Sequence, residues 1–107
     1  MITQETKFIS FKEVIDLLEQ GKAVARKSWG GNIFAVKQIE SIIPSHVIPN
    51  MTSLSNDTKT LLAQKENRSI HYINQCLIII LDENEARATY YMPTWDDIFA
   101  TDWYVVE

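Results

Sequence analysis

One amphipathic helix can be read between Ser10 and Gly21, and it constrains the fold more than any other stretch. Ser10 and Glu13 have the spacing of a capping box, and Gly21 is the residue type that ends a helix in the left-handed conformation. The apolar residues between them recur at helical spacing: Phe11, Val14, Ile15, Leu17 and Leu18. This pattern predicts a helix over Phe11–Gln20 with one buried face.

Most of the remaining chain shows strand patterns joined by turn residues. Residues 23–28 alternate as a strand, and the turn Gly30-Gly31-Asn32 leads into a second strand over 33–39. Residues 70–81 predict a long β-branched strand, with a polar turn at 82–85 and a hairpin partner over 86–92. Residues 102–106 predict a terminal strand.

Two further helices are short, and one segment has no regular pattern. A helix is expected over 57–64, capped by Ser55 or Asn56, and another begins after the cap residue Thr94. Residues 40–56 predict a loop between prolines, with apolar residues exposed enough to suggest a subunit contact. The sum is one α+β domain over residues 1–107, with an N-terminal amphipathic helix, a mostly antiparallel sheet of about five strands and two short helices.

Charge and cysteine content narrow the classes of partner. A net charge of −4 disfavours a nucleic-acid polymer, whereas a small anion needs only one local cationic pocket. Cys76 is the only cysteine, so no disulfide or cysteine-rich metal site is expected. The longest apolar run, 77–81, is too short to span a bilayer, and the N-terminus lacks an apolar signal segment. We therefore expect a cytoplasmic protein.

The stretch from Arg26 to Gly31 carries the residue types that bind a nucleotide. Arg26 and Lys27 suit phosphate, Trp29 offers a flat face to a purine, and the glycines allow close approach of the backbone. The alternative is a strand that ends in a turn, with Trp29 in the core and solvated charges. If Val24 faces the core, so does Arg26, which then needs a ligand oxygen or a carboxylate, Asp97 or Asp102. Lys27 is expected on the same strand face as Trp29.

The C-terminal third supplies the other candidates. Trp95 at the start of the last helix lines a pocket or a subunit contact, and Trp103 is a pocket residue or a core residue. Asp97 with Asp96 could be an acid–base pair, but at the first turn of a helix these carboxylates fit the cap and the dipole better. Asn74 could read an adenine edge or belong to a strand edge.

Two blocks together resemble a known family. GKAVARKSWGG at 21–31 fits G-x-x-V-x-R-x-x-W-x-G, and PTWDDIFATDW at 93–103 fits P-[ST]-x-x-D-[ILM]-x-A-x-D-W; YINQ at 72–75 is also similar. The chain resembles the small phage and prophage domain family that includes the second Thoeris anti-defence protein. Two departures are a longer segment at 40–68, and Trp95-Asp96 in place of the expected Gln-[ET].

The resemblance implies a non-catalytic sponge without cofactor or metal, which sequesters the glycocyclic ADP-ribose signal of Thoeris. Some relatives also hold cyclic dinucleotides. It implies a homotetramer in the bacterial host cytoplasm, with pockets between subunits, and it favours Arg26, Lys27, Trp29, Asp97 and Trp103 as ligand-binding residues. The rival hypothesis is a structural or protein-interaction module of phage origin without a small-molecule ligand. A nucleotide-processing enzyme ranks third, because no metal cluster, phosphate loop or nucleophile–base pair is evident.

Overall fold

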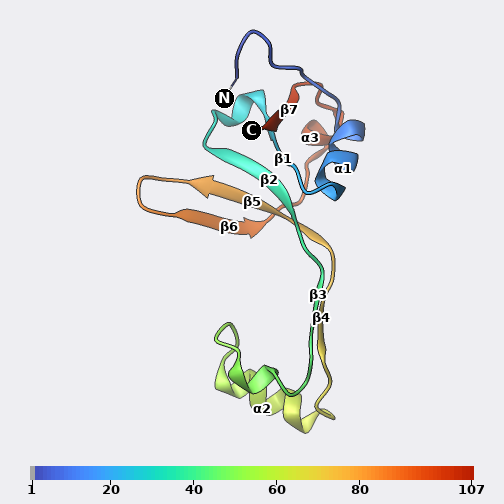
Figure 1. The fold of residues 1–107 in the computed structure, drawn as a ribbon, viewed down its shortest axis with the longest axis vertical. Coiled ribbons are helices and arrows are strands. Elements are labelled where there is room, and N and C mark those ends of the chain that lie inside the picture. The colour runs from blue at the N-terminus through green and yellow to red at the C-terminus, as the bar shows by residue number, and fades with distance from the viewer. Residues whose placement is uncertain (1) are drawn as a thin grey trace. The chain divides into compact units, whose positions relative to one another are not determined.

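The computed structural model describes residues 2–107, which fold as two compact units. Ile39–Asn74 form one unit, and the chain before and after this segment forms the other. Figure 1 shows the helices and strands of both units. The expected α+β class is confirmed.

The larger unit is built on a five-stranded antiparallel sheet in the order β6-β5-β2-β1-β7. Its strands are β1 (Ala23–Arg26), β2 (Ile33–Gln38), β5 (Gln75–Leu81), β6 (Ala86–Tyr90) and β7 (Trp103–Val106). Helices α1 (Phe11–Glu19) and α3 (Trp95–Phe99) belong to the same unit. The hairpins over β1–β2 and β5–β6 are confirmed, each with a turn between its two strands.

The core lies between α1 and the β1–β2–β7 part of the sheet. Its buried members come from all of these elements: Val14, Leu18, Val24, Ala35 and Trp103. Helix α1 ends as expected, with Gly21 at φ +85° and the Lys22 N–H bonded to the Leu17 carbonyl at 3.0 Å. The capping box expected at its start is absent, because the Ser10 side chain makes no capping hydrogen bond.

The smaller unit replaces the loop expected over 40–56 and part of the long strand expected over 70–81. Strands β3 (Ser41–Ile43) and β4 (Ile70–Tyr72) form a two-stranded antiparallel sheet. Helix α2 (Asn56–Gln64) follows the short 3₁₀-helix η2 (Ile48–Asn50), and Ser55 caps α2 by accepting the Thr58 N–H. The apolar run therefore contains two strands, β4 and β5, in different sheets.

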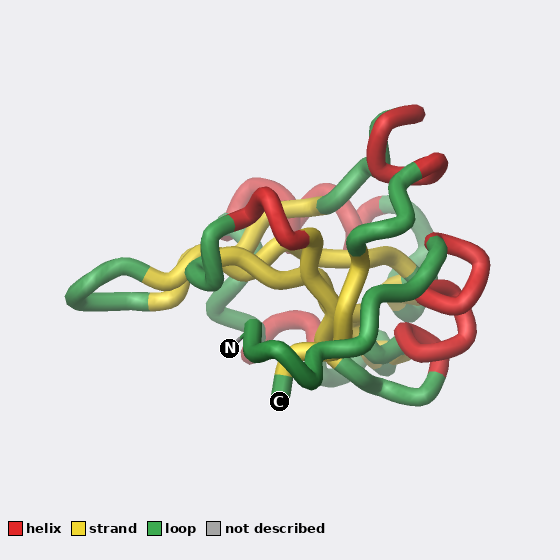
Figure 2. The backbone as a smooth tube through the Cα atoms, turned by 90° about the horizontal axis from the view of Figure 1, so that it is seen from above, coloured by secondary structure: helices red, strands yellow, loops and turns green. Residues whose placement is uncertain are grey.

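One face of the sheet over β2, β5 and β6 is apolar and not buried. Residues paired across antiparallel strands share a face, and Phe34, Ile79 and Ala88 are such a set. The whole set, called here the apolar sheet face, comprises Phe34, Val36, Leu77, Ile79, Leu81, Ala86, Ala88 and Tyr90. None of its members is buried, and the tip of the β5–β6 hairpin extends away from the helices of its unit in both views (Figures 1 and 2).

Candidate functional site

Helix α3 begins with the capping box expected from Thr94 and Asp97. The Asp97 N–H donates to the Thr94 hydroxyl at 3.1 Å, and the Asp97 carboxylate accepts the Thr94 N–H at 3.0 Å. A helix of five residues has little stability of its own. Its position must therefore be fixed by contacts with the rest of the fold.

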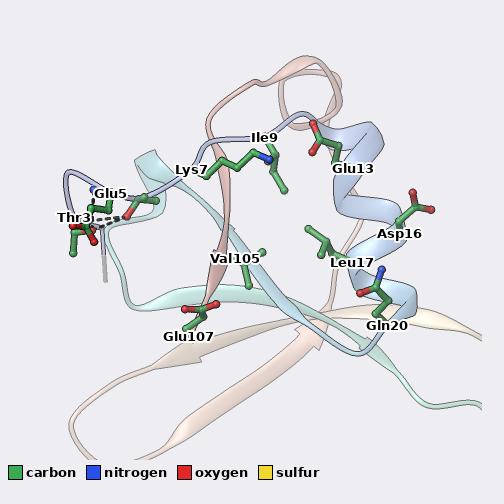
Figure 3. Close-up of a pocket in the computed structure, with 11 residues that line it drawn as sticks. Thr3, Glu5, Lys7, Ile9, Glu13, Asp16, Leu17, Gln20, Val105 and Glu107 are labelled. Atoms are coloured by element: carbon green, nitrogen blue, oxygen red, sulfur yellow. Dashed lines mark hydrogen bonds between the residues drawn. The ribbon is translucent and has the colours of Figure 1, made fainter.

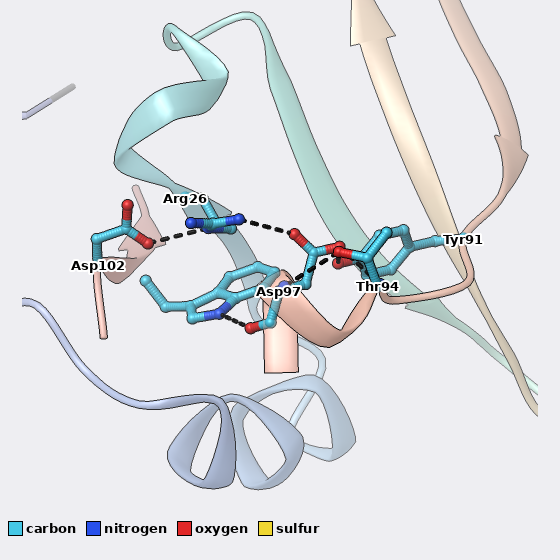
Figure 4. A network of polar contacts seen from close by, with 6 residues as sticks. Arg26, Tyr91, Thr94, Asp97 and Asp102 are labelled. Atoms are coloured by element: carbon cyan, nitrogen blue, oxygen red, sulfur yellow. Dashed lines mark hydrogen bonds and ion pairs between the residues drawn. The ribbon is translucent and has the colours of Figure 1, made fainter. Parts of the chain in front are cut away.

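The Asp97 carboxylate supplies those contacts. It accepts hydrogen bonds from Arg26 Nη1 on β1 at 3.0 Å and from the Tyr91 hydroxyl at 2.8 Å, as Figure 4 shows. The backbone carbonyl of Asp97 accepts the indole N–H of Trp103 at 2.8 Å. One residue of α3 is thus tied to β1, to the segment after β6 and to β7. We call Arg26, Tyr91, Thr94, Asp97, Asp102 and Trp103 the Asp97 network.

Arg26 is held by a second carboxylate. Its Nε donates to Asp102 at 3.0 Å, and Asp102 directly precedes β7. Two carboxylates on one guanidinium leave the immediate surroundings of Arg26 with excess negative charge. The sequence left two partners open for Arg26, a ligand oxygen or a carboxylate, and the structure shows the carboxylates Asp97 and Asp102. Because these two groups offset the charge of Arg26, an anionic ligand gains little electrostatic attraction at this position.

The electrostatics of the Asp97 network stabilise its ionised form. Burial alone would raise the pKa of the Asp97 carboxyl, but the hydrogen bonds from Thr94, Tyr91 and Arg26 outweigh it and hold the pKa below its usual value. The hydrogen bond with Asp102 raises the pKa of Arg26 against the opposing effect of burial. Burial raises the pKa of Tyr91 well above its usual value, and the bond to Asp97 adds to this.

A pH dependence of stability follows from the Asp97 carboxyl. Its pKa is lowered in the folded chain, so as the pH falls the unfolded chain binds a proton first, near its ordinary pKa of about 4. Its contribution to stability is therefore complete above that value and disappears as the pH falls through the folded pKa. Urea unfolding at a series of pH values should show a decline from about pH 5 downward.

In Asp97→Asn the unfolding free energy should lack this part of the decline with falling pH, because no carboxyl remains at that position to bind a proton. Asp96→Asn, one residue earlier on the same helix, is the matched control and should keep it. Equal slopes for the wild type and Asp97→Asn would contradict the assignment.

Trp29 packs against the core. Its ring is half-buried and meets Trp103 and Tyr91 edge-on, with centroids 5.2 Å and 5.8 Å away. The strand expected over 23–28 ends at Arg26, and residues 27–29 form a 3₁₀ turn, η1. The prediction that Lys27 and Trp29 share a strand face is therefore wrong, because they are not on a strand.

Lys27 and Trp95 remain accessible. Lys27 makes no ion pair within residues 2–107, and its ammonium lies 5.8 Å from the centroid of the Phe8 ring. The Trp95 side chain is 73 % exposed and stacks on Phe99, with centroids 5.7 Å apart and ring planes 19° from parallel. Sequence reasoning singled out Trp95 but not Phe99, although their separation by one helical turn was a signal for the pair.

The remaining candidate lies in the other unit. Asn74 is exposed in Ile39–Asn74, whereas the other candidates belong to the sheet-based unit. The hypothesis that it reads an adenine edge stays a prediction.

One groove in the described part of the chain is acidic. It has a volume of about 800 Å³ and lies among the N-terminal segment, α1 and the end of the chain. Glu5, Glu13, Asp16 and Glu107 line it around an apolar floor, and Lys7 is the basic side chain among them (Figure 3). Excess carboxylate repels a doubly anionic nucleotide, and neither Lys27 nor Trp95 lines this groove.

The cysteine and the remaining acidic and histidine residues form no further candidate site in the described part of the chain. Burial raises the pKa of the Cys76 thiol, with Lys37 opposing, as fits an unreactive core residue. Within residues 2–107, no three His, Cys, Asp or Glu side chains lie together as a metal site would need. None of the helices in the described part of the chain is long and apolar enough to cross a membrane.

The Asp97 network joins the two sequence blocks noted above. Arg26 comes from residues 21–31, and Asp97, Asp102 and Trp103 come from 93–103; Trp29 of the first block packs on Trp103 of the second. A family model described as Tad2-like, the Thoeris anti-defense 2-like domain, matches residues 9–106. No curated protein matches the chain.

Proposed function

The chain belongs to the Thoeris anti-defense 2-like family, and we propose that it acts against Thoeris by sequestering a cyclic ADP-ribose-type signal without degrading it. The match over residues 9–106 is the observation that carries the proposal. We further propose that it is not an enzyme and works in the bacterial host cytoplasm. Within the Asp97 network every carboxylate, hydroxyl and guanidinium is already hydrogen-bonded. A network so saturated is better suited to hold the fold than to move protons.

The binding surface is centred on Trp95 and Phe99. The Asp97 network fixes α3, and so it holds these two exposed rings in one position. A purine that stacks on Trp95 gains about 1–3 kcal/mol. Lys27, unlike Arg26, makes no ion pair with a carboxylate in residues 2–107, so its ammonium is available to a phosphate group.

A single chain supplies too little binding free energy to sequester a signal molecule. Competition with a signalling receptor calls for nanomolar affinity, about −12 kcal/mol. One stacked base with two charge-assisted hydrogen bonds gives roughly 4–9 kcal/mol before ordering costs. Because the groove lined by Glu5, Glu13, Asp16 and Glu107 repels an anion, we place the pocket between copies of the chain.

The apolar sheet face supports assembly of these copies. Its eight residues carry no charge and are not buried by the chain itself. Homomeric interfaces have such apolar centres. We propose a homotetramer in which this face packs against another copy. The subunit contact suggested for residues 40–56 stays a prediction, since Ile48 in that segment is buried whereas Ile42 is 61 % exposed.

The proposal is tested by retention of the signal. Purified protein is incubated with glycocyclic ADP-ribose, filtered and heat-denatured, and the released compound is identified by mass spectrometry. Intact compound released in proportion to protein is expected. Failure to retain it, or recovery of a degraded product, would refute sequestration. A panel of cyclic dinucleotides in the same assay tests the wider ligand range.

Replacing Trp95 by alanine should weaken binding about 5- to 150-fold, the equivalent of the 1–3 kcal/mol of one stacked base. Isothermal titration calorimetry measures the change. Met92→Ala is the matched control, since Met92 is 86 % exposed and leaves the Trp95–Phe99 stack in place. Unchanged affinity in Trp95→Ala would remove Trp95 from the site.

A protein-interaction module is the second candidate. Ile39, Ile42 and Ile73 in the smaller unit are 87, 61 and 67 % exposed, which favours a contact with another protein. An assembled protein that retains none of the nucleotides would support this function instead.

A further inference from the structure

Strand β6 is an open edge of the five-stranded sheet. The order β6-β5-β2-β1-β7 gives it one neighbour, β5. The opposite edge, β7, is partly closed by Ile9, which exchanges two backbone hydrogen bonds with Trp103 at 2.8 and 3.3 Å. All five residues of β6 are exposed, and no other described strand pairs with its outer side.

Two backbone hydrogen bonds fix which groups of β6 point outward. Tyr91 donates its N–H to Cys76 at 2.9 Å, and Asp82 donates to Glu85 at 3.0 Å, at the two ends of the β5–β6 ladder. Antiparallel ladders alternate hydrogen-bonded and non-hydrogen-bonded pairs. Counting in twos from either end, Arg87 and Thr89 direct their N–H and C=O groups to β5. Ala86, Ala88 and Tyr90 direct theirs away from the sheet.

This edge has little of the usual protection against pairing. The five pairs from Leu77↔Tyr90 to Leu81↔Ala86 run without a bulge, and β6 contains no proline or lysine. Its one charged residue, Arg87, lies 3.5 Å from the Asp82 carboxylate of its own hairpin. Six outward backbone groups therefore lack a partner strand within the described chain.

We propose that β6 pairs antiparallel with β6 of a second copy, about a twofold axis at Ala88. This register places Ala88 opposite its equivalent and Ala86 opposite Tyr90, so all three outward-facing residues are paired. Six hydrogen bonds form, one for each outward N–H. Arg87 stands opposite Thr89, and the two arginines do not meet.

The pairing gives the assembly a second contact besides the apolar sheet face. Ala86, Ala88 and Tyr90 belong to that face, so joining two β6 strands makes the face continuous across both copies. If the twofold axes of the edge contact and the face contact cross at right angles, the two contacts together close a tetramer. The inference rests on the homo-oligomer proposed above and specifies how two of its copies meet.

Disulfide trapping tests the register. In a hydrogen-bonded antiparallel pair the Cα atoms are about 5.5 Å apart, which a disulfide can bridge. In a Cys76→Ser background, Ala88→Cys should form a covalent dimer on mild oxidation. Ala86→Cys is the matched control: its equivalent lies about 14 Å away across the axis, so it should stay uncrosslinked. The proposal would be overturned if Ala88→Cys formed no covalent dimer, or if Ala86→Cys formed as much covalent dimer as Ala88→Cys.

Removing one donor provides an independent test. Ala88→Pro deletes an outward N–H and leaves the β5 ladder intact, so native mass spectrometry should show half the wild-type assembly mass. Ala88→Val keeps the N–H and should keep that mass. Circular dichroism reports whether Ala88→Pro is folded. If it is not, the comparison of Ala88→Cys with Ala86→Cys decides whether β6 pairs with β6. A wild-type monomer would refute both the assembly and this edge. If the wild type is an oligomer but Ala88→Cys forms no covalent dimer, only the β6 pairing is refuted. The proposed sequestration is judged separately, by the signal-retention assay.

Discussion

Asp97→Ala should lose about 3–5 kcal/mol of unfolding free energy, the cost typical of breaking a buried ion pair by removing one partner. The Asp97 side chain is 10 % exposed, and three donors depend on it: Arg26, Tyr91 and the Thr94 backbone. Without the carboxylate, Arg26 Nη1, the Tyr91 hydroxyl and the Thr94 N–H lose their acceptor while partly buried, and Arg26 keeps only its bond to Asp102. Since domains of this size are stable by about 5–15 kcal/mol, the loss is a large fraction of the total and should lower the urea midpoint clearly.

Urea denaturation followed by circular dichroism measures the loss. Asp96→Asn is the control, because Asp96 is exposed on the same helix and makes no side-chain hydrogen bond in the described structure; its effect should stay within about 0.5 kcal/mol. A loss below about 1 kcal/mol in Asp97→Ala would mean that water replaces the carboxylate, and that α3 is positioned by apolar packing instead.

The Asp97 network explains why two blocks far apart in the sequence identify one family. Arg26 and Trp29 from the first block contact Asp97, Asp102 and Trp103 from the second. The pattern therefore records a structural requirement, the fixing of α3 and β7 onto β1. Ligand specificity is better sought in residues that the pattern leaves free, such as Trp95 and Phe99.

Local signals predicted most of the larger unit. The helix ending at Gly21, the β5–β6 hairpin and the Thr94–Asp97 capping box depend on residues within a few positions of one another, so the sequence alone specifies them. The capping box at Ser10 failed although its spacing fits, since the Ser10 hydroxyl makes no capping bond. Residues 27–29 form a turn where alternation suggested a strand, because β1 ends where Arg26 meets its two carboxylates.

The parts of the fold that the sequence did not predict depend on pairing between strands far apart in the chain. Apolar residues run through 70–81, yet β4 pairs with β3 whereas β5 pairs with β2 and β6. Composition does not distinguish these partners. The same limit applies to the candidate site: an exposed Trp95 and a half-buried Trp29 look alike in sequence, and only their neighbours separate them.

Ile79→Glu should convert the proposed tetramer into dimers. Ile79 is the middle residue of β5 on the apolar sheet face, paired with Phe34 and Ala88. In the isolated chain its side chain is only partly buried, so a carboxylate there can reach water. Between two copies it would be enclosed by apolar groups at a cost of several kcal/mol, which weakens the face contact more than about 100-fold.

Sedimentation velocity and native mass spectrometry give the mass, and circular dichroism confirms that the variant folds. Leu81→Glu, at a site 42 % exposed, should have the same effect with less risk to the fold. Thr89→Glu introduces the same charge on the other face of β6 and should leave the tetramer intact. Because the face contact and the β6 edge join different pairs of copies, Ile79→Glu combined with Ala88→Pro should yield monomers. If both glutamate variants on the apolar sheet face keep the wild-type mass, that face does not join copies, and the pocket must be completed in another way.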